Sequence, residues 1–197
     1  AKTFRHKQYE EYKAGRQQTP LELLSQIPLM HDVLDAMNIS VFEKETYEAD
    51  DLIGTITAEA SRRGIESIII TGDKDELQLI DKNTKVVINK KGMTEFDVYD
   101  EAAMIDRYSL TPKQFIDLKG LMGDKSDNIP GVPGIGEKKG IALLKEYGSV
   151  EGVLENADKI KGKLGENVRA NKEMATLSKS LATIRRDVPL DYEFDDL

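Results

Sequence analysis

The sequence predicts an α/β protein, with a mostly parallel central sheet flanked by helices and a helical subdomain after it. Strand and helix patterns alternate over residues 39–97, which is typical of α/β layers. Residues 67–71 read Ser-Ile-Ile-Ile-Thr, and such a β-branched run is typical of a strand buried on both faces of a parallel sheet. Beyond residue 100 the hydrophobic periodicity is helical.

Each element is predicted from a local pattern. Residues 21–37 place apolar side chains three and four positions apart, which predicts an amphipathic helix bent near Pro28. A second helix is expected over 47–63, where Gly64 ends it. Strands are expected at 39–42, 67–71, 85–88 and 94–97, with a turn at 90–92. Later helices are expected at 101–108, 112–122, 137–147, 150–155 and 166–184.

These elements suggest three parts in chain order. A helical N-terminal segment covers residues 1–20, and an α/β core covers 21–110. A helical subdomain covers 111–197 and ends in an acidic tail.

The composition excludes several classes of protein. Hydrophobic residues make up 39% of the 197 residues and charged residues 32%, which is typical of a globular chain. No apolar run approaches the roughly 20 residues of a membrane span, and no signal peptide is expected. Cysteine is absent, which excludes disulfides, iron–sulfur clusters and a thiol nucleophile and suits a reducing cytoplasm. With only two histidines, a histidine-rich metal site or a histidine-based catalytic triad is not expected.

The net charge of −8, taken alone, argues against a nucleic-acid partner. The acid is unevenly placed, however: seven carboxylates form three compact groups, and five more follow Arg186. Without those twelve, 28 basic groups would face 24 acidic ones. The remaining surface is therefore expected to be mildly basic.

The three acidic groups predict a site for divalent cations. Asp73 and Asp75 directly follow the strongest strand, where open α/β sheets place their functional crevice. The other groups begin one helix and follow another: Glu48, Asp50 and Asp51, and Asp124 and Asp127. Converging carboxylates repel one another, and hard cations such as Mg²⁺ or Mn²⁺ resolve the repulsion. Each group alone is more often a solvated turn or a helix cap.

A glycine-rich hairpin over residues 129–148 predicts a phosphate contact. Gly134 and Gly136 allow backbone N–H groups to approach an anion at a helix N-terminus. Lys138 and Lys139 stand in the first helical turn, where the helix dipole disfavours cations, so they are expected to face an external anion. The alternative is a plain helix–turn–helix packing corner.

The N-terminal segment interleaves aromatic and basic residues. On a helix, Arg5, Tyr9, Lys13 and Arg16 fall roughly on one face. Stacking combined with phosphate neutralisation is how proteins hold single-stranded nucleic acid. A solvated face of mixed charge is the alternative.

Together these elements resemble the 5′-nuclease (flap endonuclease) superfamily, and within it the 5′→3′ exonuclease domains of bacterial DNA polymerase I. The matching stretches run in family order: Phe4-Arg-His-Lys, Tyr12-Lys-Ala-Gly-Arg16, Tyr47-Glu-Ala-Asp-Asp51, Thr71-Gly-Asp-Lys-Asp75 and the segment 123–136. The resemblance implies a PIN-like nuclease core and a helix–three-turn–helix motif. It also implies a first strand and two further aspartates that this sequence does not contain.

The resemblance implies a role for each site residue. Glu48, Asp50, Asp51, Asp73, Asp75, Asp124 and Asp127 would ligate two or more Mg²⁺ or Mn²⁺ ions. Lys13 and Arg16 would lie on a helical arch near the scissile phosphate, and Tyr12 close to the displaced strand. The loop at Gly131, Gly134, Ile135 and Gly136 would hold duplex DNA, in this family often through a bound K⁺.

The expected function is a metal-dependent structure-specific 5′ nuclease. Its partners would be DNA with a 5′ flap or a single-strand/duplex junction, RNA primers, and a fused or associated polymerase, in the cytoplasm near the nucleoid. The alternatives are a duplex-DNA-binding module without catalysis, or an inactive fragment of such a nuclease. A small-molecule phosphohydrolase with an aspartate nucleophile fits poorly, because it leaves the hairpin and the basic segments unexplained.

Overall fold

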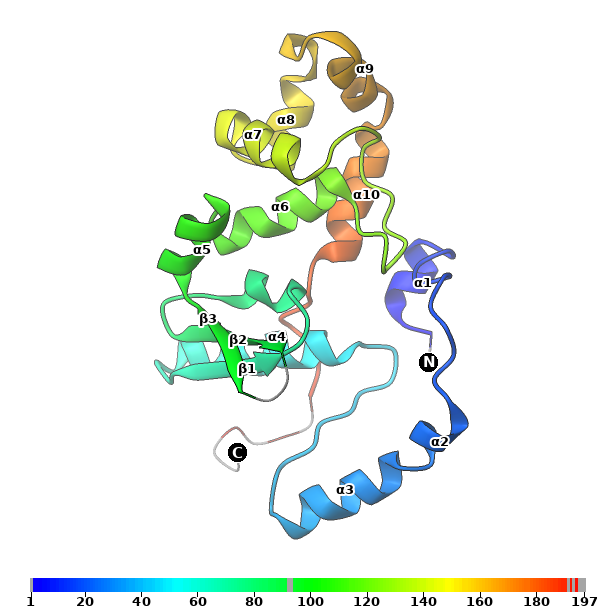
Figure 1. The fold of residues 1–197 in the computed structure, drawn as a ribbon, viewed down its shortest axis with the longest axis vertical. Helices are drawn as coiled ribbons and strands as arrows, with labels where there is room; N and C mark the ends of the chain where they lie inside the picture. The colour runs from blue at the N-terminus through cyan, green and yellow to red at the C-terminus, as the bar shows by residue number, and fades with distance from the viewer. Residues whose placement is uncertain (1, 92–93, 191, 193, 195–197) are drawn as a thin grey trace.

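A computed structural model describes residues 2–91, 94–190, 192 and 194. The helices before the sheet are α1 (Phe4–Gln8), α2 (Leu21–Leu24), α3 (Ile27–Ala36) and α4 (Ala49–Arg62). Those after it are α5 (Glu101–Tyr108), α6 (Pro112–Met122), α7 (Glu137–Tyr147), α8 (Val150–Glu155), α9 (Gly162–Ala170) and α10 (Lys172–Ala182). Two short 3₁₀ helices are η1 (Asp75–Leu79) and η2 (Ala157–Lys159). The small sheet lies beside α4, helices α5 to α10 extend above it, and α2 and α3 lie below on a separate arm (Figure 1).

The sheet is mixed rather than mostly parallel. Its order is β1 (Ser67–Thr71), β2 (Thr84–Lys91) and β3 (Glu95–Tyr99). β1 and β2 are parallel, whereas β2 and β3 are antiparallel with an irregular register near Asn89. The antiparallel pair follows from the short connection between the strands, since a parallel pair needs a crossover of a dozen or more residues. Part of the predicted 90–92 turn lies outside the described residues.

β1 is buried on one face only, which corrects the prediction from its β-branched run. Ile69 is 6% exposed and packs into the core, but Ile68 and Ile70 are 67% and 74% exposed. Side chains alternate across a strand, and no described element covers the face that carries Ile68 and Ile70. A continuous apolar run therefore did not indicate two buried faces here.

Four further predictions need correction. Residues 39–42 form no strand in the described structure, because no neighbouring strand pairs with them. The helix expected over 21–37 is broken at residues 25–26, and Pro28 lies in the first turn of the second piece, where its missing N–H costs nothing. The helix expected over 166–184 is two helices, α9 and α10, separated at Asn171. The segment 1–20, predicted to be helical, is a helix only at Phe4–Gln8 among its described residues and continues in turns, so Lys13 and Arg16 do not lie on a helix. The predicted helices between residues 47 and 155 and the strands at 85–88 and 94–97 are present within a few residues.

Helix α6 joins the sheet to the helical subdomain. It packs against η1 on one side and against α7 and α10 on the other, with Leu118 and Leu121 in the main core. Gly120 allows the close approach to α10, because a Cβ there would lie 2.8 Å from the Cβ of Lys179. The chain after α10 then returns along α4, where Val188 N–H donates to the Thr55 hydroxyl.

The loop between α6 and α7 turns back on itself tightly. Asp124 and Ile129 exchange backbone hydrogen bonds of 2.9 and 2.7 Å. Gly131 N–H donates to the buried Ser178 hydroxyl at 2.9 Å, and its φ of 62° is in the left-handed region. A Cβ on Gly131 would lie 2.3 Å from the backbone nitrogen of Gly123. The loop therefore requires glycine at this position.

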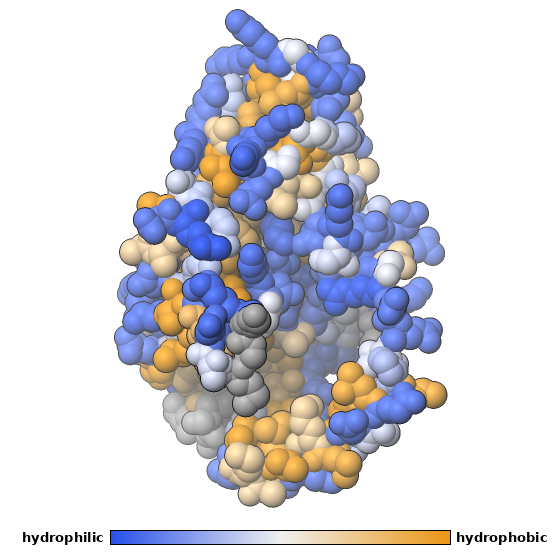
Figure 2. Space-filling model, viewed as in Figure 1, coloured by the Kyte–Doolittle hydropathy of each residue, from blue (hydrophilic) through white to orange (hydrophobic). Residues whose placement is uncertain are grey.

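Residues 20–45 form an arm that projects from the body and carries α2 and α3 (Figure 1). Its side chains are mostly exposed, including the apolar Leu21, Leu29, Val33 and Met37. Figure 2 shows these apolar residues as an orange area at the lower end of the molecule. The segment before the arm, residues 3–12, instead packs into the body through Arg5 and Tyr12. Across the described residues, no helix has the length and apolarity to cross a membrane.

We expect Gly131→Ala to lower the free energy of unfolding by about 3 kcal/mol, because the left-handed backbone and the close contact both oppose a Cβ. Gly148→Ala is the matched control: its φ is 84°, but nothing lies within 4 Å of an added Cβ. The control should cost about 1 kcal/mol. Urea unfolding measures both, and equal losses would contradict the crowding at Gly131.

Candidate functional site

A buried ion pair between Arg5 and Asp51 organises the start of α4. The guanidinium donates to both carboxylate oxygens at 2.8 Å, and Asp51 is 0% exposed. The Asp51 carboxylate also accepts from the backbone N–H of Glu48 at 3.0 Å and of Arg185 at 2.8 Å. Arg5 in turn donates to the carbonyls of Leu181 and Thr183.

These hydrogen bonds engage the polar groups of both the Arg5 and the Asp51 side chains. All four donors on Asp51 come from the protein itself, and the carboxylate faces the interior. Burial alone would raise the pKa of Asp51, but the hydrogen bonds from Arg5, Arg185 and Glu48 lower it. We therefore retain neither Asp51 as a metal ligand nor Arg5 as a DNA contact.

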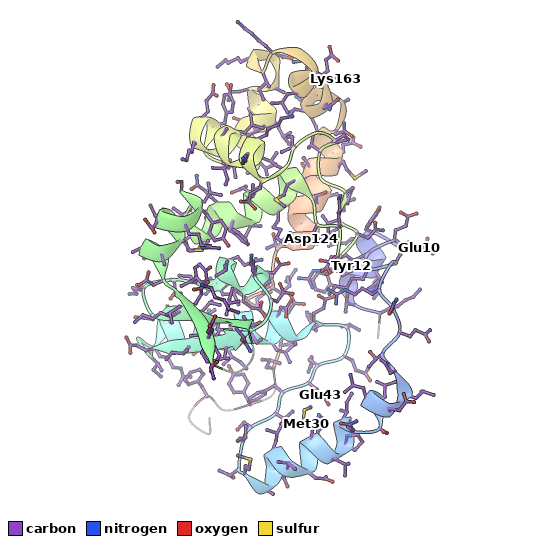
Figure 3. All side chains as sticks on the ribbon, viewed as in Figure 1. Glu10, Tyr12, Met30, Glu43, Asp124 and Lys163 are labelled. Carbon is purple, nitrogen blue, oxygen red and sulfur yellow. The ribbon has the colours of Figure 1, made fainter. Side chains whose placement is uncertain are left out.

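A second group joins the N-terminal segment to the turn after α6. Lys13 Nζ lies 2.7 Å from Glu48 Oε2 and 3.6 Å from Asp127 Oδ2. Arg16 pairs with the other oxygen of Asp127. The buried Tyr12 hydroxyl is 3.2 Å from both carboxylates, so the structure places Tyr12 beneath the site rather than at its surface. Figure 3 shows Tyr12 and Asp124 close together where α1 meets this turn.

A third group is built around Lys119 on α6. Its ammonium lies 2.7 Å from Asp75 Oδ1 and also pairs with Asp124. Burial opposes ionisation of Asp124, but hydrogen bonds from Lys119 and Ser126 lower its pKa to about 2. Burial raises the pKa of Asp75 despite the ammonium, and Asp73 and Asp124 add to the rise. Lys119 therefore holds together one carboxylate from the sheet edge and one from the helical subdomain.

Asp50 interacts electrostatically with carboxylates of both the Lys13 group and the Lys119 group. Burial first, and then the charges of Asp73 and Glu48, raise the pKa of Asp50 to about 6. A cleft of about 490 Å³ opens beside these side chains and is also lined by His6, Lys13 and Arg16. Glu48, Asp50, Asp73, Asp75, Asp124 and Asp127 thus lie in one region at the carboxyl end of β1, and of the seven predicted ligands only Asp51 turns away.

The donor set suits a hard divalent cation. All six side chains offer carboxylate oxygens, the ligands that Mg²⁺ and Mn²⁺ prefer, and Lys13, Arg16 and Lys119 balance only part of their charge. Burial first, and then the like charges of Asp73 and Glu48, disfavour the charged form of Asp50. Within the described residues, no three acidic or histidine side chains stand close enough to hold one ion as they are, and Lys13 and Lys119 each pair with two of the carboxylates.

The glycine-rich hairpin divides into buried and exposed positions. Gly131 and Ile135 are buried, and Ile135 belongs to the main core. Gly134 and Gly136 are exposed, as are the lysines that follow them, Lys138 and Lys139. Lys139 Nζ donates to the Gly134 carbonyl at 2.9 Å. The exposed backbone and Lys138 are therefore the parts of the hairpin accessible to a ligand.

Three residues of this region were not predicted from the sequence. His6 lines the cleft, Lys119 bridges two carboxylates, and Glu76 lies buried beside the acidic groups. Glu76 directly follows Asp75, so the acidic run offered a signal. No sequence pattern indicated Lys119, because a lysine on an amphipathic helix is ordinarily solvated.

Comparisons with known proteins place this architecture in a family. The family pattern described as "5'-3' exonuclease, N-terminal resolvase-like domain" matches residues 1–109. The pattern described as "5'-3' exonuclease, C-terminal SAM fold" matches residues 110–197. The first match covers the α/β layer with its acidic edge, and the second covers the helical subdomain. The chain belongs to the 5′-3′ exonuclease family.

The similar curated proteins are much longer than this chain. DNA polymerase I of Bacillus caldotenax is 54% identical over 196 residues, and that of Bacillus subtilis is 50% identical over the same length. Each alignment covers 99% of this chain but 22% of the relative. The chain thus spans about a fifth of the length of these polymerases.

Solved structures share the fold. A zinc-bound structure of the T5 5′-exonuclease has a TM-score of 0.76 and 26% identity, covering 92% of this chain and 70% of that one. The catalytic core of Rad2 in complex with DNA substrate has a TM-score of 0.53 at 17% identity, which supports the fold alone; that alignment covers 98% of this chain and 65% of that one. The predicted fold class is confirmed, with the mixed sheet as its one correction.

We expect Asp51→Asn to lower the free energy of unfolding by about 3 kcal/mol, because it leaves Arg5 charged and buried without its partner. Asp50→Asn is the matched control one position away. It removes a charge that burial disfavours, so it should not destabilise the metal-free protein. Urea unfolding at neutral pH separates the two, and similar effects would contradict the opposite environments of these neighbours.

The contribution of Asp51 should also depend on pH. A carboxylate whose pKa is lowered on folding stabilises the protein above its unfolded pKa, about 4, and loses this effect as pH falls through the folded value. We expect the difference in unfolding free energy between the wild type and Asp51→Asn to be complete at neutral pH and to shrink in acid. A difference that grows below about pH 4 would contradict the lowered pKa.

Proposed function

We propose that the chain is a metal-dependent structure-specific 5′ nuclease that cleaves phosphodiesters near single-strand/duplex junctions. The observation that carries the proposal is the cleft at the end of β1. There, the carboxylates of Glu48, Asp50 and Asp73 line the cleft together with two cations, Lys13 and Arg16, from a different segment of the chain, and both cations also pair with Asp127. A site with ligands for cations and donors for phosphate suits phosphodiester hydrolysis better than either feature alone.

The protein's own cations would bind the substrate phosphate. The Arg16 side chain is 51% exposed and Lys13 is partly exposed, so both can reach an anion in the cleft. Tyr12 and Asp127 hold them in position from beneath. Two or more divalent ions held by the carboxylates at the end of β1 would supply an activated water and stabilise the leaving oxygen. His6 lies on the same wall and can donate a hydrogen bond to substrate.

The hairpin would hold the duplex part of the substrate. The exposed Gly134 and Gly136 backbone and Lys138 can contact phosphates without reading sequence. Gly131 and Ile135 would support that loop from below, because both are buried. A K⁺ ion at the loop remains a prediction of the family resemblance.

The relatives suggest the biological setting. The similar curated proteins are DNA polymerases I, and a related T5 flap endonuclease structure contains DNA and metal ions. We infer that the substrates are 5′ flaps and RNA primers on DNA, in the bacterial cytoplasm near the nucleoid, and that a polymerase is fused to the nuclease or acts beside it.

Cleavage of a labelled 5′-flap DNA in Mg²⁺ or Mn²⁺ tests the proposal. We expect Lys13→Ala and Arg16→Ala each to reduce the cleavage rate about 100-fold, because each removes a donor from the developing phosphate charge. Lys163→Ala is the control, since Lys163 lies on the surface at the far end of the molecule (Figure 3). Binding of the flap without any cleavage would favour the non-catalytic DNA-binding module.

A metal titration tests the acidic site separately from catalysis. We expect Mn²⁺ at 100 times its dissociation constant to stabilise the fold by about 2.7 kcal/mol. The combined change Asp124→Asn and Asp127→Asn should abolish this shift, whereas Asp158→Asn, on the exposed surface, should retain it. Thermal unfolding with and without Mn²⁺ provides the measurement. No shift in the wild type would show that the carboxylates do not form a cation site.

A further inference from the structure

Glu76 is a buried carboxylate that neither the family resemblance nor the acidic groups identified. It lies in η1, directly after Asp75, and is 2% exposed. The two residues that follow it are fixed: Leu77 is in the main core, and the Gln78 side chain bonds the backbone of Ala182 and Ile184. The short helix cannot rotate to bring Glu76 into solvent without breaking these contacts.

The contacts of Glu76 lead toward the acidic cleft. Thr71 Oγ1 donates to Glu76 Oε1 at 3.2 Å, and the same hydroxyl accepts from the Asp73 N–H at 3.0 Å. One hydroxyl therefore links Glu76 to the loop that positions Asp73. The second oxygen, Oε2, is buried and has no hydrogen-bond partner among the described residues.

An unpartnered buried carboxylate is costly, and its surroundings increase the cost. Asp50 and Asp73 add like charge in the neighbourhood of Glu76. A charged oxygen without a partner is strongly disfavoured in a protein interior. Lysines relieve this cost for Asp75, Asp124 and Glu48, but the structure gives Oε2 of Glu76 no such relief.

We propose that Glu76 is a positioning carboxylate of the divalent-cation site, which strengthens cation binding through its buried charge beside Asp50 and its Thr71 link to Asp73. This inference rests on the proposed metal site and adds to it a residue that follows the Asp73–Asp75 group directly but was not among the predicted ligands. A cation in the cleft supplies the compensating charge that Oε2 lacks. The same carboxylate disfavours the metal-free protein.

Direct Mn²⁺ binding, followed by the electron paramagnetic resonance of free Mn²⁺ at mildly alkaline pH, tests the proposal without any nuclease assay. We expect Glu76→Gln, which keeps the shape and can keep the Thr71 bond, to weaken Mn²⁺ binding about 10-fold. Glu76→Asp keeps the charge and should lie nearer the wild type. Urea unfolding without metal should show Glu76→Gln to be at least as stable as the wild type.

The outcomes separate this inference from the proposed function. Asp73→Asn serves as the reference for loss of a proposed ligand. One result would overturn the inference: the wild type binds Mn²⁺, Asp73→Asn binds it weakly, and Glu76→Gln binds it as tightly as the wild type. Glu76 would then be a neutral acid with a structural role only. Equal weakening of Mn²⁺ binding by Glu76→Gln and Glu76→Asp would also overturn the inference, because the shape of the side chain rather than its charge would then be responsible. If wild type does not bind Mn²⁺, the metal site itself fails and the role of Glu76 fails with it.

Discussion

The bidentate pair between Arg5 and Asp51 is the contact on which the rest of the site depends. Asp51 ties together three segments that are distant in sequence: the N-terminal segment, the first turn of α4 and the chain after α10. Replacing a buried ion pair with apolar residues is often neutral for stability, but removing one partner is not. The pair therefore contributes geometry more than net stability.

The geometry of the Arg5–Asp51 pair gives neighbouring carboxylates on α4 opposite orientations. Because Asp51 turns into the interior, Glu48 and Asp50 are left on the side of α4 that faces the cleft. The carboxylates there would repel one another without compensation. Lys13 and Lys119 each bridge two of them, one from α4 or the sheet edge and one from the turn after α6. Two ammonium groups thus connect the α/β layer and the helical subdomain across the site.

Local patterns predicted most elements, and the positions of the acidic groups at strand and helix ends predicted most of the site. They could not distinguish Asp50 from Asp51, since a rotation of about 100° per residue decides which one meets Arg5. They could not show that Ile68 and Ile70 are exposed, or that Asn171 interrupts a helix, because both depend on what packs nearby. Lys119 and the burial of Tyr12 depend likewise on contacts distant in sequence.

The arm that carries α2 and α3 has an energetic consequence. Its apolar side chains are largely exposed, so melting the arm would release little buried surface, whereas melting β1 or α6 would disrupt the main core. Proteins open in cooperative units, and the free energy of opening is smallest where little apolar surface is buried. The arm is therefore a separate unit of low local stability attached to a stable body. The body can keep its ion pairs intact while the arm takes up different conformations.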